Sequence, residues 1–211
     1  MLYLVRHGQT EFNVQERIQG LCDSALTEKG RADAAKLAKA LADVDFKEVY
    51  ASALGRAIQT AEIVQGSRGL PVHSLPELNE MGFGIWEGRT VTELKQIGAG
   101  DLADYRYHPQ NYLPPEGGQS FAEMFKQVEK AGHFLFERAK NQDILAVSHG
   151  ACIKAFCCFW QGKKIDEVWE PPLIENTGLT LIDCSGERPK FVLIGDLKHL
   201  QDKPSLGVRT W

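Results

Sequence analysis

Residues 143–150 read Asp-Ile-Leu-Ala-Val-Ser-His-Gly, a short apolar run that ends in a histidine and a glycine. Such a run is typical of a strand that is buried on both faces of a sheet. A helix is expected directly afterwards, over 151–160. Because a buried strand followed at once by a helix is the repeating unit of parallel sheets covered by helices, this stretch predicts an α/β fold.

The same alternation of strands and helices continues along the chain. The other expected strands lie at 2–5, 49–51, 179–182 and 191–194, and the other expected helices lie at 27–42, 55–64 and 120–140. The last two strands flank a Ser-Gly turn, which predicts an antiparallel hairpin near the C-terminus. The expected architecture is a three-layer sandwich in which helices flank a mostly parallel central sheet.

The length and organisation of the chain favour one domain. Folding of 211 residues buries roughly 70% of the surface of the unfolded chain, which supports a full hydrophobic core. No linker, low-complexity tract or repeat of domain size is visible, so we expect a single domain over 1–211. The stretch at about 98–118 has weak periodicity, three prolines and several aromatic residues, and we expect it to form a lid-like insertion.

Composition excludes several classes of protein. The chain has 24 Lys and Arg and 28 Asp and Glu, a formal charge of −4, which argues against binding to nucleic acid or a membrane surface. No apolar run approaches the ~20 residues of a membrane span, and the N-terminus lacks the pattern of a signal peptide. The cysteines are Cys22, Cys152, Cys157, Cys158 and Cys184. This odd set without a CxxC pair predicts reduced thiols, small core residues and a cytoplasmic location.

Two of the expected strands end in the same way. The first ends in Val-Arg-His-Gly at 5–8 and the later one in Val-Ser-His-Gly at 147–150. Ligands bind beyond the carboxyl ends of the strands in parallel sheets, so His7 and His149 are expected to face one pocket. Either histidine alone is more readily explained as a polar strand terminus, whereas the matched pair favours function.

Arginines accompany this pair. Arg6 precedes His7, and Arg56 lies in the first turn of the helix expected over 55–64. A guanidinium binds phosphate through parallel hydrogen bonds, and a helix N-terminus adds free N–H groups. A cation at this position opposes the helix dipole, so Arg56 is either a solvated charge or the partner of a bound dianion. The second interpretation is favoured.

These residues carry a resemblance to a known family. Residues 4–13, Leu-Val-Arg-His-Gly-Gln-Thr-Glu-Phe-Asn, resemble the signature of the histidine phosphatase superfamily, in the branch related to cofactor-dependent phosphoglycerate mutase. Further similar blocks stand at 25–30, 52–61, 78–80, 84–88, 117–120 and 147–150. They come in the order of the family and extend to about Gly178. The resemblance implies a phosphoglycerate mutase-like fold.

The resemblance also implies roles, position by position. His7 matches the nucleophile that accepts the phosphoryl group as phosphohistidine. Arg6, Arg56 and His149 match the cluster around the phosphate, in which the second histidine is expected to be charged. Glu80 matches the residue that protonates the leaving oxygen and then activates water.

Other positions are expected at the edge of this cluster. Asn13 and Gln19 match residues that line the phosphate pocket, and the main-chain N–H of Gly150 is expected near the phosphate. Glu87 is interpreted as a packing and turn residue. No metal or other cofactor is implied, because cationic side chains supply the charge that Mg²⁺ supplies elsewhere.

The implied activity is the metal-independent hydrolysis of a small phosphorylated metabolite. The identity of this metabolite stays open, and so does the oligomeric state of the protein. A phosphoglycerate mutase is the alternative, but residues 98–120 contain Arg106 as their only Lys or Arg, whereas the mutase branch has a basic cluster there. A catalytically silent phosphoprotein-binding module is a second alternative, which would lack His7, Glu80 or an arginine. A metallohydrolase would be inactivated by a chelator. Aromatic residues that include Phe83, Tyr105 and Tyr107 are expected to form part of the substrate wall.

Overall fold

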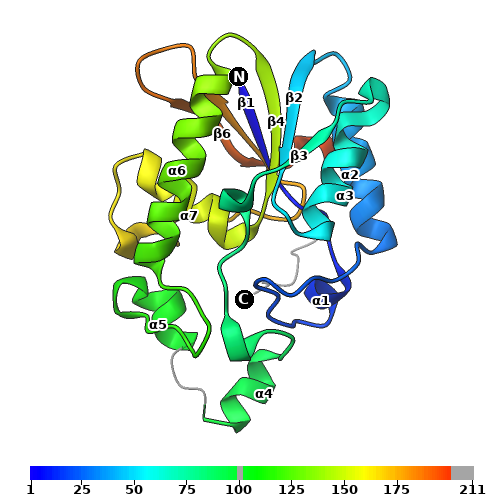
Figure 1. The fold of residues 1–211 in the computed structure, drawn as a ribbon. Helices are drawn as coiled ribbons and strands as arrows, with labels where there is room; N and C mark the ends of the chain where they lie inside the picture. Colours follow the sequence, from blue (N-terminus) through cyan, green and yellow to red (C-terminus); the bar gives the residue numbers. More distant parts are fainter. Residues whose placement is uncertain (99–101, 201–211) are drawn as a thin grey trace.

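The computed structural model describes residues 1–98 and 102–200 and contains a six-stranded sheet between two layers of helices (Figure 1). The strands are β1 (Leu2–Arg6), β2 (Phe46–Ala51), β3 (Val72–Ser74), β4 (Asp143–Ser148), β5 (Leu179–Asp183) and β6 (Lys190–Asp196). Their order is β3-β2-β4-β1-β5-β6. β1 to β4 pair in parallel, while β5 pairs antiparallel with both β1 and β6. The mostly parallel sheet and the C-terminal hairpin are confirmed.

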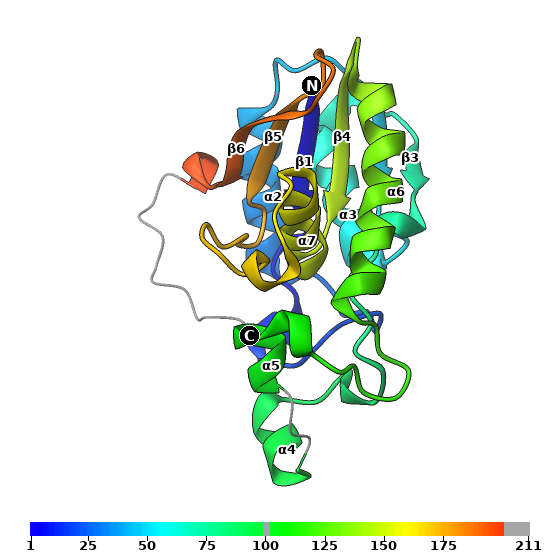
Figure 2. The same ribbon diagram turned by 90° about the vertical axis from the view of Figure 1, so that its left-hand side faces the viewer.

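The two helical layers follow from the alternation of side chains along the strands. The long helices are α2 (Glu28–Ala40), α3 (Gly55–Gln65), α6 (Phe121–Ala139) and α7 (Gly150–Trp160). α6 and α7 cover one face of the sheet, and α2 and α3 cover the other (Figures 1 and 2). Ile144 packs in the core under α6 and α7, whereas its neighbour Leu145 packs under α2 and α3. Successive residues of a strand point to opposite faces, so an unbroken apolar run fills both cores. The three-layer prediction is confirmed.

The helix boundaries follow local capping signals. The Thr27 hydroxyl accepts a hydrogen bond from the N–H of Gly30 at the start of α2. The predicted capping box of α6 is present, because the Ser120 hydroxyl accepts from the N–H of Glu123 and the Glu123 carboxylate accepts from the N–H of Ser120. These signals place both helix starts within a residue of the predicted positions.

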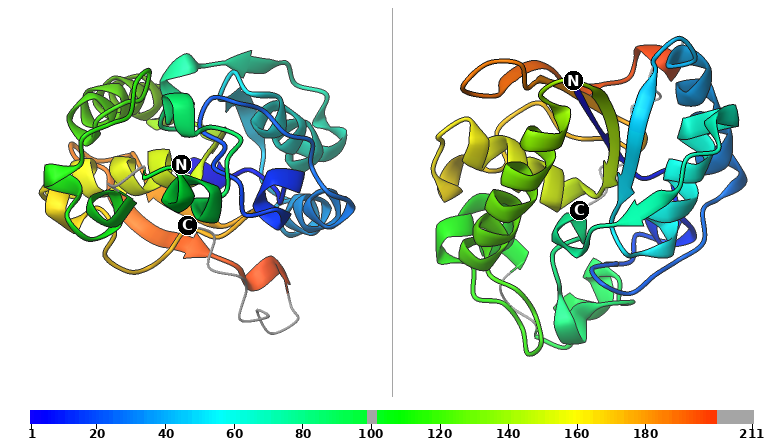
Figure 3. Two further views of the ribbon diagram at one scale, coloured as in Figure 1. Left: turned by 90° about the horizontal axis from the view of Figure 1, so that it is seen from below. Right: turned by 45° about the horizontal axis from the view of Figure 1, so that its top comes forward.

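Short helices gather beyond the carboxyl ends of β1 and β4 (Figures 2 and 3). They are α1 (Glu11–Val14), α4 (Val91–Gln96) and α5 (Leu102–Tyr107). The expected insertion at 98–118 is more regular than its sequence suggests, since it contains α5 and a 3-10 turn at Pro109–Asn111; residues 99–101 lie outside the described residues. Short 3-10 turns also occur at Gly66–Arg68, Pro76–Leu78, Gly84–Trp86, Ile165–Glu167 and Lys198–Leu200.

Aromatic packing anchors the insertion to the body of the protein. The ring of Tyr105 lies 5.2 Å from that of Phe83 and 5.4 Å from that of Phe121, centroid to centroid. The indole N–H of Trp169 also donates to the carbonyl of Tyr105, at 2.6 Å. Tyr107 is 69% exposed, and its place in the substrate wall stays a prediction.

The remaining composition-based predictions have mixed outcomes. All five cysteines are free, and four are buried as expected. The prediction is wrong for Cys22, which is exposed because it lies in a loop beyond the carboxyl ends of the strands. None of the helices in the described ranges is long and apolar enough to span a membrane. The cytoplasmic location stays a prediction.

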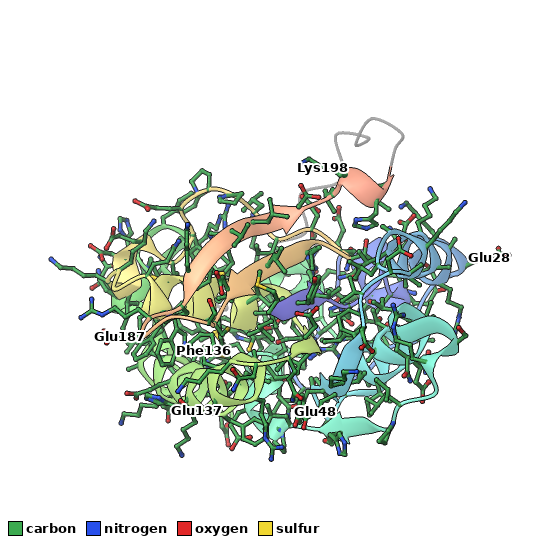
Figure 4. The ribbon with its side chains drawn as sticks, turned by 90° about the horizontal axis from the view of Figure 1, so that it is seen from above. Glu28, Glu48, Phe136, Glu137, Glu187 and Lys198 are labelled. Atoms are coloured by element: carbon green, nitrogen blue, oxygen red, sulfur yellow. The ribbon has the colours of Figure 1, made fainter. Side chains whose placement is uncertain are left out.

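At the end of the molecule opposite α4 and α5, charged side chains such as Glu48 and Glu137 line the rim (Figure 4).

Candidate active site

The register of two neighbouring strands brings the two predicted histidines together. β1 and β4 pair in parallel with Arg6 opposite Ser148, so His7 and His149 follow at the same level of the sheet. Their ring centroids lie 5.1 Å apart. Both side chains are buried, with His7 2% and His149 0% exposed. The sequence-based expectation of one shared location for this pair is therefore met by the geometry.

The hydrogen bonding of His7 fixes which ring nitrogen is available for chemistry. Nδ1 lies 2.7 Å from the main-chain oxygen of Gly8, which can only accept, so Nδ1 carries the proton. Burial, reinforced by the charges of Arg56 and Arg6, lowers the pKa of His7 well below its ordinary value. The ring is therefore neutral at pH 7, and its Nε2 lone pair is the nucleophilic one.

His149 is held at both ring nitrogens. Nδ1 accepts from the Nε–H of Arg56 at 3.2 Å, and Nε2 lies 2.7 Å from the hydroxyl of Ser52. The Ser52 hydroxyl in turn donates to Oδ1 of Asn79 at 2.9 Å. Burial and the charge of Arg56 lower the pKa of His149 well below its ordinary value. The expectation of a charged second histidine is therefore wrong for this arrangement, because the ring is buried beside a cation rather than an anion.

Arg56 is the most buried charged side chain near the site, at 1% exposed. Its Nη1 donates to the carbonyl of Cys22 at 2.8 Å and to the carboxylate of Asp23 at 3.1 Å, and its Nη2 donates to the carbonyl of Gly20 at 2.8 Å. Burial lowers the pKa of Arg56, while the nearby carboxylates of Glu80 and Asp23 raise it. The charge of Arg56 at the start of α3 is thus stabilised by hydrogen-bond acceptors in the loop of residues 20–23. The sequence analysis did not connect this loop with Arg56.

Arg6 is the last residue of β1 and directly precedes His7. Its Nη1 donates to the carbonyl of Ile174 at 2.6 Å, and its buried Nε has no hydrogen-bond partner among the described residues. The guanidinium lies against Gly150, where an added Cβ would be 3.5 Å from Nε. Arg6 therefore has a donor ready for an anion, next to the main chain of the residue expected near the phosphate.

Glu80 reaches the same end of the sheet from the loop before Met81. Its Oε1 accepts from the main-chain N–H groups of Met81 and Cys152, both at 3.0 Å, and its Oε2 accepts from that of Ala151 at 3.2 Å. Two of these donors belong to the first turn of α7, so the carboxylate lies at the positive end of that helix. This contact places the carboxylate of Glu80 beside the residues that follow His149.

The two amides predicted to line the pocket are oriented by Thr10. The Thr10 N–H donates to Oδ1 of Asn13 at 3.0 Å, and the Thr10 hydroxyl lies 3.0 Å from Oε1 of Gln19. Each amide oxygen is thus engaged within the protein. The NH₂ group of each amide points away from its oxygen, and this is the end that can donate to an anion.

A segment just before β5 supports the ends of β1 and was missed by the sequence analysis. The Asn176 side chain donates to the carbonyl of His7 at 3.1 Å, and the N–H of Thr177 donates to that of Arg6, also at 3.1 Å. Thr177 is buried with φ of 58°, a conformation that is strained for a β-branched residue. No local pattern marks this segment, because its partners lie far away in the sequence.

The chemistry of this cluster suits an oxyanion. Two guanidinium groups, two imidazoles and amide donors surround the carboxyl ends of β1 and β4, with the carboxylate of Glu80 at the side and that of Asp23 bound to Arg56. In the part of the chain that the structure describes, no group of three or more His, Cys, Asp or Glu side chains could hold a metal ion. The arrangement is able to hold a tetrahedral anion against a neutral imidazole.

The sequence is similar to several phosphatases and to a mutase. The chain is 40% identical over 148 residues to the adenosylcobalamin/alpha-ribazole phosphatase of Salmonella typhimurium, covering 70% of this chain and 73% of that protein. It is 30% identical over 199 residues to phosphoserine phosphatase 1 of Hydrogenobacter thermophilus, covering 94% and 93%. It is also 31% identical to the "Probable phosphoglycerate mutase GpmB" of Erwinia tasmaniensis, covering 95% of each chain.

Solved structures resemble the whole fold. Bacillus stearothermophilus YhfR superimposes with a TM-score of 0.90 at 36% identity, covering 94% of this chain and 98% of that one. The alpha-ribazole phosphatase from Shigella flexneri has a TM-score of 0.84 at 32% identity, covering 93% and 96%. The sequence pattern of the histidine phosphatase superfamily (branch 1) matches residues 2–197. This chain therefore belongs to the histidine phosphatase superfamily, branch 1.

Proposed function

We propose that the chain is a metal-independent phosphomonoesterase that hydrolyses a small phosphorylated metabolite through a phosphohistidine on His7. The supporting observation is the state of that ring. Its Nδ1–H is held by the carbonyl of Gly8, and it is buried next to two cations that keep it neutral. A neutral imidazole with a fixed tautomer, facing donors suited to phosphate, is the arrangement that nucleophilic attack on phosphorus requires.

The reaction has two steps. In the first, Nε2 of His7 forms a bond to phosphorus while the bond from phosphorus to the ester oxygen breaks, and Glu80 gives its proton to the departing oxygen. In the second, Glu80 takes a proton from water, whose oxygen attacks phosphorus and breaks the bond to His7. The products are the alcohol and inorganic phosphate, and the enzyme returns to its initial state.

The surrounding residues stabilise the charge of the transferred group. Arg6 and Arg56 donate to its equatorial oxygens, and the NH₂ groups of Asn13 and Gln19 and the N–H of Gly150 line the pocket. Nδ1 of His149 accepts from the Nε–H of Arg56, so His149 stays neutral in this proposal and helps to orient the Arg56 guanidinium.

The position of the Arg106 side chain favours hydrolysis over mutase activity. The guanidinium of this residue lies 5.2 Å from the ring centre of Trp169, so it stacks on the protein. A mutase needs cations in this region to hold a second acidic group of its substrate. The similarity to a mutase of Erwinia tasmaniensis keeps that activity as the second candidate.

The substrate class is a small phosphomonoester. The relatives include an adenosylcobalamin/alpha-ribazole phosphatase, a phosphoserine phosphatase and a probable phosphoglycerate mutase, so ribazole phosphate, phosphoserine and phosphoglycerate are the first compounds to test. The contact of Tyr105 with Phe83 adds an aromatic element from the insertion to this end of the molecule, which we propose acts as a lid.

A turnover screen tests the proposed function. The protein is incubated with phosphoserine, alpha-ribazole phosphate, 3-phosphoglycerate, sugar phosphates and p-nitrophenyl phosphate, with 2,3-bisphosphoglycerate added to one series. We expect release of inorganic phosphate from at least one ester and none with His7→Ala. Interconversion of phosphoglycerates that outpaces phosphate release would make the protein a mutase. Binding of phosphopeptides without turnover of any ester would make it a binding module.

A further inference from the structure

We infer that Glu87 is a positioning residue for Arg56, which it orients through the loop of residues 20–23. This inference rests on the proposed role of Arg56 as a phosphate ligand. The Glu87 carboxylate accepts three main-chain hydrogen bonds: Oε1 from the N–H groups of Leu21 and Phe83, and Oε2 from that of Cys22, each at 2.9 Å. Three donors converge on one side chain that the sequence analysis interpreted as packing.

The peptide group between Gly20 and Leu21 connects the carboxylate to the arginine. Its carbonyl accepts from Nη2 of Arg56 at 2.8 Å, while its N–H donates to Oε1 of Glu87 at 2.9 Å. The two ends of a trans peptide point in opposite directions, so this one unit lies between a cation and an anion. Each charge polarises the peptide and strengthens the hydrogen bond at its other end.

The close approach requires glycine at position 20. Gly20 has φ of 55°, in the left-handed region, and a Cβ added to it would lie 2.2 Å from Oε1 of Glu87. Any larger residue would push the carboxylate away from the loop. The fit between this glycine and Glu87 indicates that the loop conformation and the carboxylate belong to one unit.

The loop determines how Arg56 is aimed. A guanidinium has five N–H groups, and four of those of Arg56 have acceptors in His149, Cys22, Asp23 and Gly20. Two of these acceptors are carbonyls of the loop that Glu87 holds. The fifth N–H is on Nη2, beside the bond to Gly20, and its direction is set by that bond. If the loop loses its contact with Glu87, the guanidinium can rotate, and the fifth N–H no longer points in a fixed direction.

A double-mutant cycle with inorganic phosphate and vanadate as probes tests the inference. Glu87→Gln keeps the size of the side chain but turns an NH₂ group toward main-chain donors. We expect it to weaken phosphate and vanadate binding about tenfold, within the range of couplings seen inside one hydrogen-bond network. In an Arg56→Lys background the same change should alter binding less than about twofold. The matched control is Glu62→Gln, an exposed position on the same helix as Arg56, which should leave binding unchanged.

Two further measurements separate positioning from general damage. Cys22 is the only exposed cysteine, and its hydrogen bond with Glu87 raises the pKa of its thiol. Alkylation of Cys22 should therefore become several-fold faster in Glu87→Gln, which lacks the carboxylate that raises the pKa of the thiol. Gly20→Ala disrupts the same contact through a change in the loop. Its effect on vanadate binding should not add to that of Glu87→Gln when both changes are combined.

The outcomes are distinct. Equal weakening of phosphate binding by Glu87→Gln in the wild-type and Arg56→Lys backgrounds would overturn the inference, and so would unchanged binding and unchanged Cys22 alkylation. Because binding of inorganic phosphate needs no turnover, the cycle still reads out if the wild-type protein hydrolyses no ester. Failure of the proposed function is therefore seen in the turnover screen, and failure of this inference is seen in the cycle.

Discussion

The Nε–H group of Arg56 donates a hydrogen bond of 3.2 Å to Nδ1 of His149. A guanidinium is always protonated and never accepts, so this contact leaves the lone pair of His149 on Nδ1 and its proton on Nε2. The Nε2–H then donates to Ser52 at 2.7 Å. One interaction thus sets the tautomer of a fully buried histidine and keeps a cation beside it.

The burial of two neutral histidines makes stability depend on pH. The pKa values of His7 and His149 are both lowered well below 6.5 by burial and by Arg56. Below about pH 6.5 the unfolded chain binds more protons at these residues than the folded protein does. Stability is therefore full above that pH and falls below it, by up to about 1.4 kcal/mol per pH unit for each histidine.

Urea unfolding in phosphate-free buffers between pH 5 and 8 measures this slope. His7→Gln should remove one histidine's share, while His73→Gln, at an exposed position of β3, serves as the control. The same slope in wild type and His7→Gln would contradict the assignment of a lowered pKa to His7.

Ser52 is expected to be important for stability. Its hydroxyl is fully buried and lies between Nε2 of His149 and Oδ1 of Asn79. Ser52→Ala leaves both groups without this partner, which should reduce the free energy of unfolding by about 1–3 kcal/mol. Chemical denaturation gives the value, with Ser185→Ala in the exposed turn before β6 as the comparison. A change below about 0.5 kcal/mol for Ser52→Ala would remove the serine from this network.

Metal removal should leave the reaction intact. Arg6 and Arg56 supply the positive charge in the proposed mechanism, and the structure places no cage of carboxylates among its described residues. We expect full activity after dialysis against EDTA. Complete loss of turnover that one divalent metal restores would replace the phosphohistidine mechanism by that of a metallohydrolase.

Glu80→Gln should lower kcat by about 10²–10⁴-fold, the usual range for a general acid–base group. The loss of the first step should depend on the leaving group. An alkyl phosphate releases a basic alkoxide that needs a proton, whereas p-nitrophenolate leaves without one. Burst kinetics isolate this step, because Glu80 also activates water in the second. Equal loss of burst rate for both esters would pass the acid role to another group.

The sequence predicted the strands that carry the histidines, and the reason is local. The apolar runs before His7 and His149 are short and uninterrupted. Such runs indicate strands that are buried on both faces, and this holds without knowing which strands lie beside them. The order of the strands was beyond this reasoning. That β1 and β4 are neighbours depends on long-range packing, which periodicity does not encode.

The rest of the site depends on contacts between distant residues. Asn176 supports the carbonyl of His7 across 169 positions, and Glu87 holds Leu21 across 66. Such hydrogen bonds to the main chain leave no spacing pattern in the sequence. The charge state of His149 was mispredicted for a related reason, since it depends on burial and on the direction of the Arg56 side chain.

The central claim is that His7 carries the phosphoryl group. Brief reaction with a radiolabelled phosphate ester, quenched without acid and followed by peptide mapping, tests it most directly. The account predicts label on His7 that is lost in acid and kept in alkali, and none in His7→Ala. Label on a serine or an aspartate, or undiminished labelling of His7→Ala, would contradict it.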